Sequence, residues 1–571
     1  MSRKVVFAIL AAVAIATYWN ALRVPFLWDD DIAITTNQSI HEIATSLNPP
    51  IETPASGRPA VNLSFAWNYG LDGVDPFGYH VFNLIVLVLC ALLLFGIVKR
   101  TLARQLKGAS EASVNSIAFA PALLWMVHPL LSETVDYTTQ RSESLMGLFF
   151  LLTLYSAIRA RDRKRGAKWI ALAVLACAVG MATKESMATA PIAVVLYDLI
   201  FEFDSPAQAW NVRKGLYLGL AATWLELGLI IWHWPRSTVG GTSVSPFTYA
   251  LNQTQMIARY LWLTVWPQSL VVDYGLPRQL RLMDVLPQAL LVLALLTATI
   301  VALVRRRVAG FLGAMFFLTL APTSSLVPIV SEVGAERRMF LPLAACAVLA
   351  VFAAIRFERL APRKVAIAML TIVVAALATR TVYRNRDYES PLDLWRTVVE
   401  RRPHGRARFA YANQLMEAGR HDEATAQLRL AVPDYPDARA GLGTELLLQG
   451  NIEEGISVMD AFVQAAPNLP NRIPARVLLA QAHRALAERE LTAHHAAVAA
   501  TEAKKSIAIE PNNADAHNLL GAALASQGQI VAAIPEFQAA LRINPKHETA
   551  LRNLAQAFAY GRSNTSNATG R

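Results

Sequence analysis

The stretch VFNLIVLVLCALLLFGIV, Val81–Val98, decides the fold class because it carries no charged side chain from end to end. A helix that crosses a bilayer needs about 20 apolar residues, since lipid offers its backbone no hydrogen-bond partner. Ten further runs are also predominantly apolar: Val5–Tyr18, Ile117–Leu131, Leu145–Ile158, Trp169–Ala182, Met187–Phe201, Leu216–Trp232, Val285–Val304, Phe311–Leu326, Met339–Phe357 and Val365–Ala378. We therefore expect an all-α protein built on a polytopic membrane bundle of about eleven helices.

The composition agrees with a membrane protein. Of the 571 residues, 54% are hydrophobic and 17% are charged, and the mean hydropathy is +0.34. Soluble domains average about 25% charged residues, so a disordered chain and an ordinary soluble enzyme are both excluded. The net charge of +11 lies mainly in the apolar part of the chain, where basic loops report topology. We therefore expect membrane lipids as neighbours and no nucleic-acid partner.

Cysteine usage gives no sign of a metal site. Cys90, Cys177 and Cys346 each lie inside an apolar run and are expected to be small buried hydrophobic residues. No Cys or His spacing is typical of zinc. We expect neither a metal nor a cofactor.

Basic residues between the apolar runs predict the topology. Arg3 and Lys4 precede the first run, which no small-x-small cleavage site follows, so we expect it to remain as a helix. If these residues are cytoplasmic, the segment RARDRKRGAK at 159–168 is cytoplasmic as well. The basic loops are expected on one side of the membrane and the less basic loops on the other, in turn along the chain. This alternation fails if the stretch QMIARYLWLTVW, Gln255–Trp266, also crosses the membrane, so we interpret that stretch as interfacial or re-entrant. Eleven crossings place the C-terminal part outside the cytoplasm.

From about Arg406 the chain changes to alanine-rich amphipathic helix pairs. The stretches Ala407–Pro436 and Ala514–Pro545 have the tetratricopeptide pattern, whose unit is about 34 residues long. Boundary prolines recur at intervals of 31, 44 and 34 residues, at Pro436, Pro467, Pro511 and Pro545. The long third unit predicts an insertion at Glu488–Ala496. Glycines that suit the tight turn within a helix pair stand at Gly419, Gly450 and Gly528.

The predicted organisation follows from these patterns. We expect a transmembrane domain over residues 1–380 with a large external loop at 23–80, a linker at 381–405, repeats over 406–561 and a disordered tail at 562–571. A solenoid of such repeats offers a concave surface for an acceptor protein. The alternative is that the repeats only support the membrane domain or mediate oligomers.

The first external loop begins with WDDDIAI, Trp28–Ile34, in which acids directly follow a membrane helix. Burial among aromatic neighbours raises the pKa of a carboxyl and makes it a better base, so Asp29 and Asp30 are candidate catalytic residues. The alternative is a solvated loop start or a helix cap. Further along the loop, Arg58 and His80 are candidates for acceptor binding or support, or else a headgroup anchor and a helix cap.

Ionisable residues also gather in three later external segments. Placing an ionisable side chain at membrane depth costs free energy, so we treat such residues as candidates for a functional role. The candidates are Glu133 as a catalytic acid, Glu336 as a supporting residue, and Arg141, Lys184, Arg337 and Arg338 as ligands of a donor phosphate. Acids and guanidinium groups on one face suit the binding of an anionic phosphate beside a general base.

These segments resemble a known family, the transmembrane-and-tetratricopeptide-repeat O-mannosyltransferases, which are membrane glycosyltransferases of the GT-C class. The resemblance covers nearly the whole chain and rests on WDDDIAI (28–34), GRPAVNLSFAWNYGLDGVDPFGYHVFNL (57–84), HPLLSE (128–133), the Lys184–Glu185 turn and ERRMFLP (336–342), followed by the repeats. It implies a helical bundle with a large first loop. It also implies a sugar donor on a polyprenyl or dolichyl monophosphate and a Ser or Thr hydroxyl as the acceptor.

The resemblance also implies roles for individual residues. Asp29 and Asp30 match the family's acidic pair, one of which is the general base. Glu133 matches its acidic position in the second loop, and Arg141 matches the following arginine, although the surrounding QRSES departs from the family's GRAE-like or GRAD-like string. Glu336 and Arg337 match the Glu-Arg pair of the late loop, which contacts the lipid phosphate.

The expected function is therefore transfer of mannose or another hexose from a polyprenyl-phosphate donor to extracytoplasmic proteins, with inversion and an Asp general base. Two alternatives remain at this point: a ligase or polymerase of lipid-linked glycans, and a non-enzymatic membrane scaffold that presents the repeats. We expect a bacterial inner membrane with periplasmic repeats, or alternatively an endoplasmic reticulum membrane with lumenal repeats.

Overall fold

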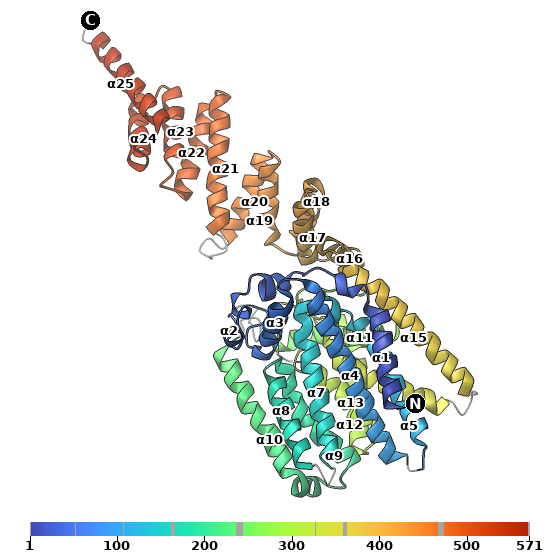
Figure 1. The fold of residues 1–571 in the computed structure, drawn as a ribbon. Helices are drawn as coiled ribbons and strands as arrows, with labels where there is room; N and C mark the ends of the chain where they lie inside the picture. Colours follow the sequence, from blue (N-terminus) through green and yellow to red (C-terminus); the bar gives the residue numbers. More distant parts are fainter. Residues whose placement is uncertain are drawn as a thin grey trace. The chain divides into compact units, whose positions relative to one another are not determined.

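The computed structural model describes two compact units, Met1–Arg402 and Pro403–Arg571. The described residues are 2–51, 53–106, 108–161, 166–235, 244–325, 327–357, 363–465 and 473–568. Within these ranges the regular structure is helical and no extended strand occurs (Figure 1). The predicted all-α class is confirmed.

The first unit is a helical bundle in which eleven helices of the described residues overlap the eleven apolar runs. They are α1 (Arg3–Tyr18), α4 (Pro76–Gln105), α5 (Glu111–Met126), α7 (Arg141–Arg159), α8 (Gly166–Met181), α9 (Ala190–Phe201), α10 (Pro206–His233), α12 (Leu286–Val304), α13 (Val308–Leu320), α14 (Phe340–Phe357) and α15 (Arg363–Asn385). The longest, α4, begins sharply because Asp75 accepts a hydrogen bond from the Phe77 N–H and Pro76 occupies the first helical position.

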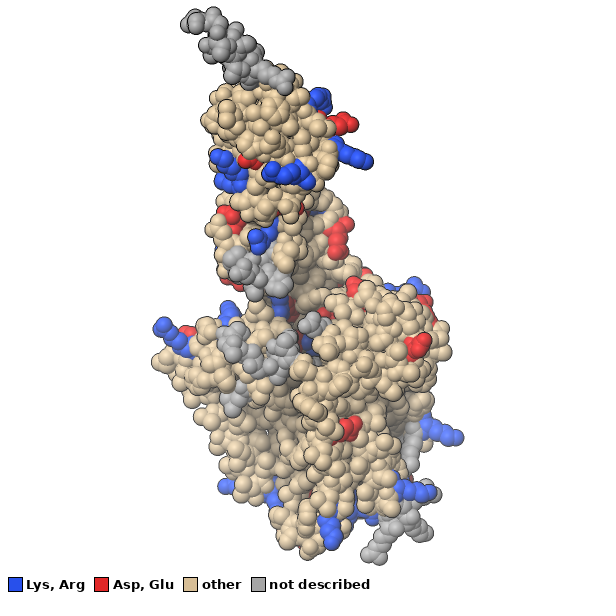
Figure 2. Space-filling model, turned by 90° about the vertical axis from the view of Figure 1, so that its left-hand side faces the viewer, with Lys and Arg blue, Asp and Glu red and all other residues tan. Residues whose placement is uncertain are grey.

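Several of these helices meet the requirements of a membrane span. In the described part of the chain, five are long and apolar enough by themselves, namely α4, α10, α12, α14 and α15 with short flanking turns. A sixth arises if Glu111–Met126 and Pro129–Asp136, which are bent by 58°, count as one span. Three shorter apolar helices are Lys4–Tyr18, Gly166–Met181 and Val308–Leu320. The chain is an integral membrane protein, and on the face drawn in Figure 2 the middle of the bundle is almost free of charged side chains.

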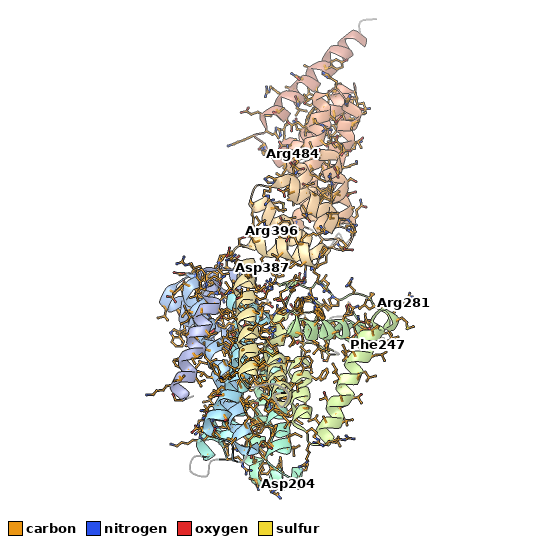
Figure 3. All side chains as sticks on the ribbon, turned by 90° about the vertical axis from the view of Figure 1, so that its right-hand side faces the viewer. Asp204, Phe247, Arg281, Asp387, Arg396 and Arg484 are labelled. Atoms are coloured by element: carbon orange, nitrogen blue, oxygen red, sulfur yellow. The ribbon has the colours of Figure 1, made fainter. Side chains whose placement is uncertain are left out.

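Helix α11 (Pro246–Val265) contains the stretch for which we expected an interfacial or re-entrant position. It runs across the direction of the neighbouring bundle helices (Figure 3). Phe247, Trp262 and Trp266 at or beside this helix are more than half exposed. Exposed aromatic side chains on a helix of this direction are typical of a membrane interface.

An apolar cavity that is partly open to the outside lies between α4, α7, α9, α13 and α14. Its wall includes Leu94, Phe150, Phe311, Leu341 and Phe352. Leu341 lies one turn after Arg337 on the chain, and Phe352 stands about 16 Å further along the axis of α14 at the usual rise per residue. The cavity therefore begins close to the ionic residues that precede α14.

The stretch expected as a linker, 381–405, is mostly ordered structure of the first unit. It holds the end of α15, a short turn and helix α16 (Pro391–Arg401). Trp395 of α16 packs edge-on against Trp28 with ring centroids 4.9 Å apart, and Arg401 donates to the Leu270 carbonyl oxygen at 2.9 Å. An amphipathic helix that covers the acidic loop thus stands where the composition suggested only a connection.

The second unit is a solenoid of helix pairs, as the repeat pattern predicts. Its described helices are α17 (Gly405–Glu417), α18 (His421–Ala431), α19 (Ala438–Leu448), α20 (Ile452–Ala465), α21 (Ile473–Thr492), α22 (Ala496–Ile509), α23 (Ala514–Ser526), α24 (Ile530–Ile543) and α25 (Glu548–Ala568). The expected tail begins inside α25, and its last three residues lie outside the described residues.

The turns of the repeats follow the predicted glycines. Gly419, Gly450 and Gly528 have φ values of 72°, 82° and 78°, which L side chains rarely adopt. The third pair has no such glycine, and His494 takes the positive φ, at 63°. The residues expected as an insertion mostly lengthen α21, which has 20 residues.

Candidate active site

Asp30 is an anchor of the first loop and is completely buried. Its carboxylate accepts hydrogen bonds from the Leu27 N–H at 3.0 Å, from the Thr139 N–H at 2.6 Å and from the Thr139 hydroxyl. Burial raises the pKa of Asp30 to about 7, against the effect of these bonds. Because its oxygens are occupied by the protein, Asp30 fixes the loop to the start of α7 and is not free to act on a substrate.

Asp29 differs from its neighbour because its side chain is only partly buried. The Tyr137 hydroxyl accepts from the Asp29 N–H at 3.1 Å and also hydrogen-bonds the carboxylate. Burial raises the pKa of Asp29, while Tyr137, Arg337 and Arg58 oppose the rise. A carboxylate with a raised pKa beside cations is suited to proton abstraction at neutral pH.

The two acids point to different partners because of the turn that precedes them. Trp28 has a φ of 42°, which is uncommon for a large side chain. Its indole rests on the Trp395 ring of α16, and this contact supports the unusual conformation. Strained backbone of this kind clusters at functional sites, where the surrounding structure holds it.

An ionic chain joins the second loop to the late loop. Glu133 is fully buried and accepts from the Arg337 backbone N–H at 2.9 Å and from Arg337 Nη1 at 2.6 Å. Arg337 Nη2 donates to Glu332 Oε2 at 2.5 Å, and Arg338 Nη2 donates to Glu332 Oε1 at 2.9 Å. The two sequence segments, 204 residues apart, therefore meet where one Glu133 oxygen accepts from the Arg337 backbone and the other from its guanidinium group.

Two further cations lie near this chain. Lys184 donates to Glu143, and both side chains are buried. Burial lowers the pKa of Lys184, and Arg58 and Arg337 act in the same direction, whereas Glu143 opposes them. Arg58 is paired less firmly, with Nη2 at 3.8 Å from Glu185, and its buried Nε has no hydrogen-bond partner among the described residues. Arg58 is thus a cation with unused donor capacity.

Three candidate residues lie in structural positions. Arg141 is fully buried, and each of its three side-chain nitrogens donates to a protein acceptor in α3 (Pro59–Asp72) or α4. His80 places its ring nitrogens 2.8 Å and 2.9 Å from the carbonyl oxygens of Val135 and Val24. Glu336 accepts from the Val271 N–H at 2.6 Å and from Arg384 at 3.3 Å. These side chains hold the loops together and present little to a ligand.

Arg338 shares features with the cations of the site and with the residues in structural positions. Its side chain is almost fully buried, and it donates to the Thr323 carbonyl oxygen at 3.0 Å as well as to Glu332. Arg338 is still connected to the site, because it shares Glu332 with Arg337. In the described part of the chain, no group of three or more His, Cys, Asp or Glu residues is arranged to hold a metal ion.

Sequence reasoning missed Glu332, Tyr137 and Thr139. Glu332 stands in the segment SEVGAERR at 331–338, five residues before Arg337, and a second acid beside two arginines was a signal that could have singled it out. Tyr137 and Thr139 carry no such signal, because their role depends on a contact with a loop more than 100 residues earlier in the chain.

Comparison with known proteins shows which proteins the chain is similar to. Residues 59–234 match the family model described as dolichyl-phosphate-mannose-protein mannosyltransferase. Residues 379–439 and 502–534 match models of tetratricopeptide repeats. The matched membrane segment contains the end of the first loop, α4 and the acidic second loop, whereas Asp29, Arg58 and the late loop lie outside it.

Curated relatives match over longer stretches. Protein O-mannosyl-transferase TMTC1 of Homo sapiens is 25% identical over 507 residues, which cover 76% of this chain and 56% of the relative. Tmtc3 of Drosophila melanogaster is 24% identical over 552 residues, which cover 82% and 59%. Human TMTC3 is 30% identical over 191 residues, which cover 31% of this chain and 20% of the relative. The chain spans less than two thirds of the length of these relatives.

Among solved structures, ArnT from Cupriavidus metallidurans bound to undecaprenyl phosphate is similar over 82% of both chains, with 17% identity and a TM-score of 0.40. A likeness at this score supports no conclusion about the site. The family models and the curated relatives confirm the resemblance to the transmembrane-and-tetratricopeptide-repeat O-mannosyltransferases.

Proposed function

We propose that this relative of the transmembrane-and-tetratricopeptide-repeat O-mannosyltransferases is a membrane glycosyltransferase. Its donor is a hexose on a polyprenyl phosphate, and its acceptor is a Ser or Thr hydroxyl of an extracytoplasmic protein. The observation that carries the proposal is Asp29, a half-buried residue whose carboxyl has a raised pKa and lies within electrostatic reach of Arg58 and Arg337. The names of the curated relatives support a mannosyl group and a protein acceptor.

In the proposed reaction the acceptor hydroxyl attacks the anomeric carbon of the sugar. Asp29 takes the hydroxyl proton as the new C–O bond forms. The bond from the anomeric carbon to the phosphate oxygen breaks, and the polyprenyl phosphate leaves with the electron pair. Attack from the face opposite the leaving group inverts the anomeric centre.

The cations of the site stabilise the negative charge that develops on the leaving phosphate. Arg58 and Arg337 are the guanidinium groups closest to this role, and Lys184 adds a third charge. The apolar cavity that begins one turn after Arg337 offers an apolar surface for the polyprenyl chain. Arg141, placed with the phosphate ligands by the sequence, instead belongs to the scaffold of the site.

The direct experiment is a transfer assay. The purified full chain in nanodiscs receives a radiolabelled polyprenyl-phosphate mannose and a mixture of external proteins from cells that lack the gene. We expect label to enter Ser or Thr residues, as mass spectrometry detects by a hexose-sized increment. Absence of transfer from several polyprenyl-phosphate hexoses, by a folded protein, would exclude this function.

Replacement of Arg58 tests the phosphate contact. We expect Arg58→Met to raise the KM for the donor roughly ten-fold, since a charge-assisted hydrogen bond contributes about 1.5–3 kcal/mol. Initial rates at varied donor concentration give KM and kcat separately. Arg396→Met removes the same group from an exposed position on α16 and is the matched control. Equal donor KM values for Arg58→Met and wild type would remove Arg58 from the phosphate site.

Truncation tests the repeats as the acceptor-binding part. A chain that ends at Arg402 lacks the second unit. We expect it to lose transfer to whole protein acceptors about 100-fold while it keeps transfer to a short Ser- and Thr-containing peptide within a few-fold, because loss of an avidity contact affects only the larger acceptor. Competition between labelled acceptors measures the ratio. Equal loss for both acceptors would indicate a supporting role for the repeats.

A further inference from the structure

Glu332 holds two arginines of the site at once. Its Oε2 accepts from Arg337 at 2.5 Å and its Oε1 accepts from Arg338 at 2.9 Å. A carboxylate that divides its oxygens between two guanidinium groups presents the same kind of charge and the same pair of acceptors as two oxygens of a phosphate. The position that Glu332 occupies is therefore one that fits a phosphate oxyanion.

Glu332 is the exposed member of the two acids that share Arg337. The Glu133 side chain is fully buried and also accepts from the backbone N–H of Arg337. Moving it away would leave that N–H without a hydrogen-bond acceptor, which costs free energy. The Glu332 side chain is 23% exposed, and its two oxygens accept from the two arginines. A phosphate that takes a nitrogen of Arg337 must displace one acid, and Glu332 is the one that solvent already reaches.

The backbone beside Glu332 is held, so the side chain is the part that can move. The Val333 N–H donates to the Gly275 carbonyl oxygen at 2.9 Å, and the Val333 carbonyl oxygen accepts from Gln253 at 2.9 Å. Gly334 packs so closely on Met256 and Tyr260 that a Cβ would lie 2.3 Å from the Met256 methyl carbon. A rotation of the Glu332 side chain requires no rearrangement of this segment.

We propose that Glu332 is a displaceable internal competitor for the donor phosphate: it occupies Arg337 and Arg338 until the phosphate of a polyprenyl-phosphate donor or product replaces it. This inference rests on the proposed function. The carboxylate keeps the arginines oriented and neutralised between turnovers, and its repulsion of a bound phosphate weakens retention of the product lipid phosphate. Glu332 is a positioning residue and takes no part in bond making.

The proposal predicts a gain of affinity, which loss of fold cannot mimic. We expect Glu332→Gln to bind farnesyl phosphate about ten-fold more tightly than wild type, since removal of the competing charge frees the binding-competent arrangement. Binding is measured on the full chain in nanodiscs by equilibrium competition, with farnesol as the probe that lacks phosphate. Glu332→Asp retains the charge and is expected to gain no affinity. Glu389→Gln removes a carboxylate from an exposed position and should match wild type.

The outcomes separate this proposal from the function on which it rests. Tighter binding of farnesyl phosphate by Glu332→Gln, with unchanged binding of farnesol, supports the competitor role. Equal or weaker binding by a folded Glu332→Gln variant, beside measurable binding by wild type, overturns it and leaves the proposed function standing. Failure of folded wild type and all variants to bind farnesyl phosphate overturns both.

Discussion

Asp29→Asn lowers the rate of sugar transfer by about 1,000-fold and leaves the fold intact, because general-base catalysis supplies roughly 10²–10⁴-fold in typical enzymes. The side chain is partly exposed, and an amide of the same shape can still bond the Tyr137 hydroxyl. Single-turnover rates with a saturating donor isolate the chemical step. The thermal unfolding midpoint of the purified protein gives the stability.

The neighbouring acid is the matched control. In Asp30→Asn an amide replaces the carboxylate that accepts from the Thr139 N–H and hydroxyl, and at least one buried hydrogen bond is lost. We expect it to lower the free energy of unfolding by about 1–3 kcal/mol. The transfer rate of Asp30→Asn should fall because the loop loosens. A second substitution that restabilises the fold should restore the transfer rate. Full transfer by Asp29→Asn would remove Asp29 from the mechanism.

The pH dependence of the transfer rate also tests Asp29 as the general base. A general base works only in its ionised form, so the rate should rise with pH through the pKa of Asp29 and then level. Because burial raises that pKa, the rising limb lies above the ordinary range of an aspartate. The limb should be present in wild type and absent from the residual activity of Asp29→Asn, whose side chain does not titrate.

The sequence predicted the membrane helices well because hydrophobicity acts locally. Each apolar run, such as Val81–Val98, needs only its own composition to become a helix in lipid. The stretch 381–405 was misjudged as a linker for the opposite reason. Nothing within it reports that Trp395 covers Trp28, a contact between residues 367 positions apart. The spacing of repeats, by contrast, is a local period and located the turn glycines correctly.

At the candidate site, the sequence proposed residues but could not predict how their side chains are paired. Asp29 and Asp30 are adjacent and chemically identical, and only the φ of Trp28 and the partner at Thr139 tell the base candidate from the anchor. Lys184 and Arg337 were assigned to a phosphate without their acids, Glu143 and Glu332. Pairing between distant loops sets which charges are free, and a single sequence carries no record of it.

Arg141 provides the second large effect, on stability. Its guanidinium donates to Asn83 Oδ1 at 2.7 Å, to Asn68 Oδ1 at 2.7 Å and to the Tyr79 carbonyl oxygen at 3.0 Å. It also lies 4.2 Å over the Phe82 ring. The residue therefore ties α3 and α4 to the start of α7, which positions the whole first loop.

We expect Arg141→Met to lower the free energy of unfolding by about 3–5 kcal/mol, because several buried acceptors lose their donor together. Arg141→Lys keeps the charge but lacks the planar fork, so it should recover only part of the loss. Thermal unfolding in nanodiscs measures both, with Arg58→Met as the comparison that alters donor KM and spares the fold. An Arg141→Met protein that melts like wild type and shows a raised donor KM would return Arg141 to the phosphate site, as the sequence first indicated.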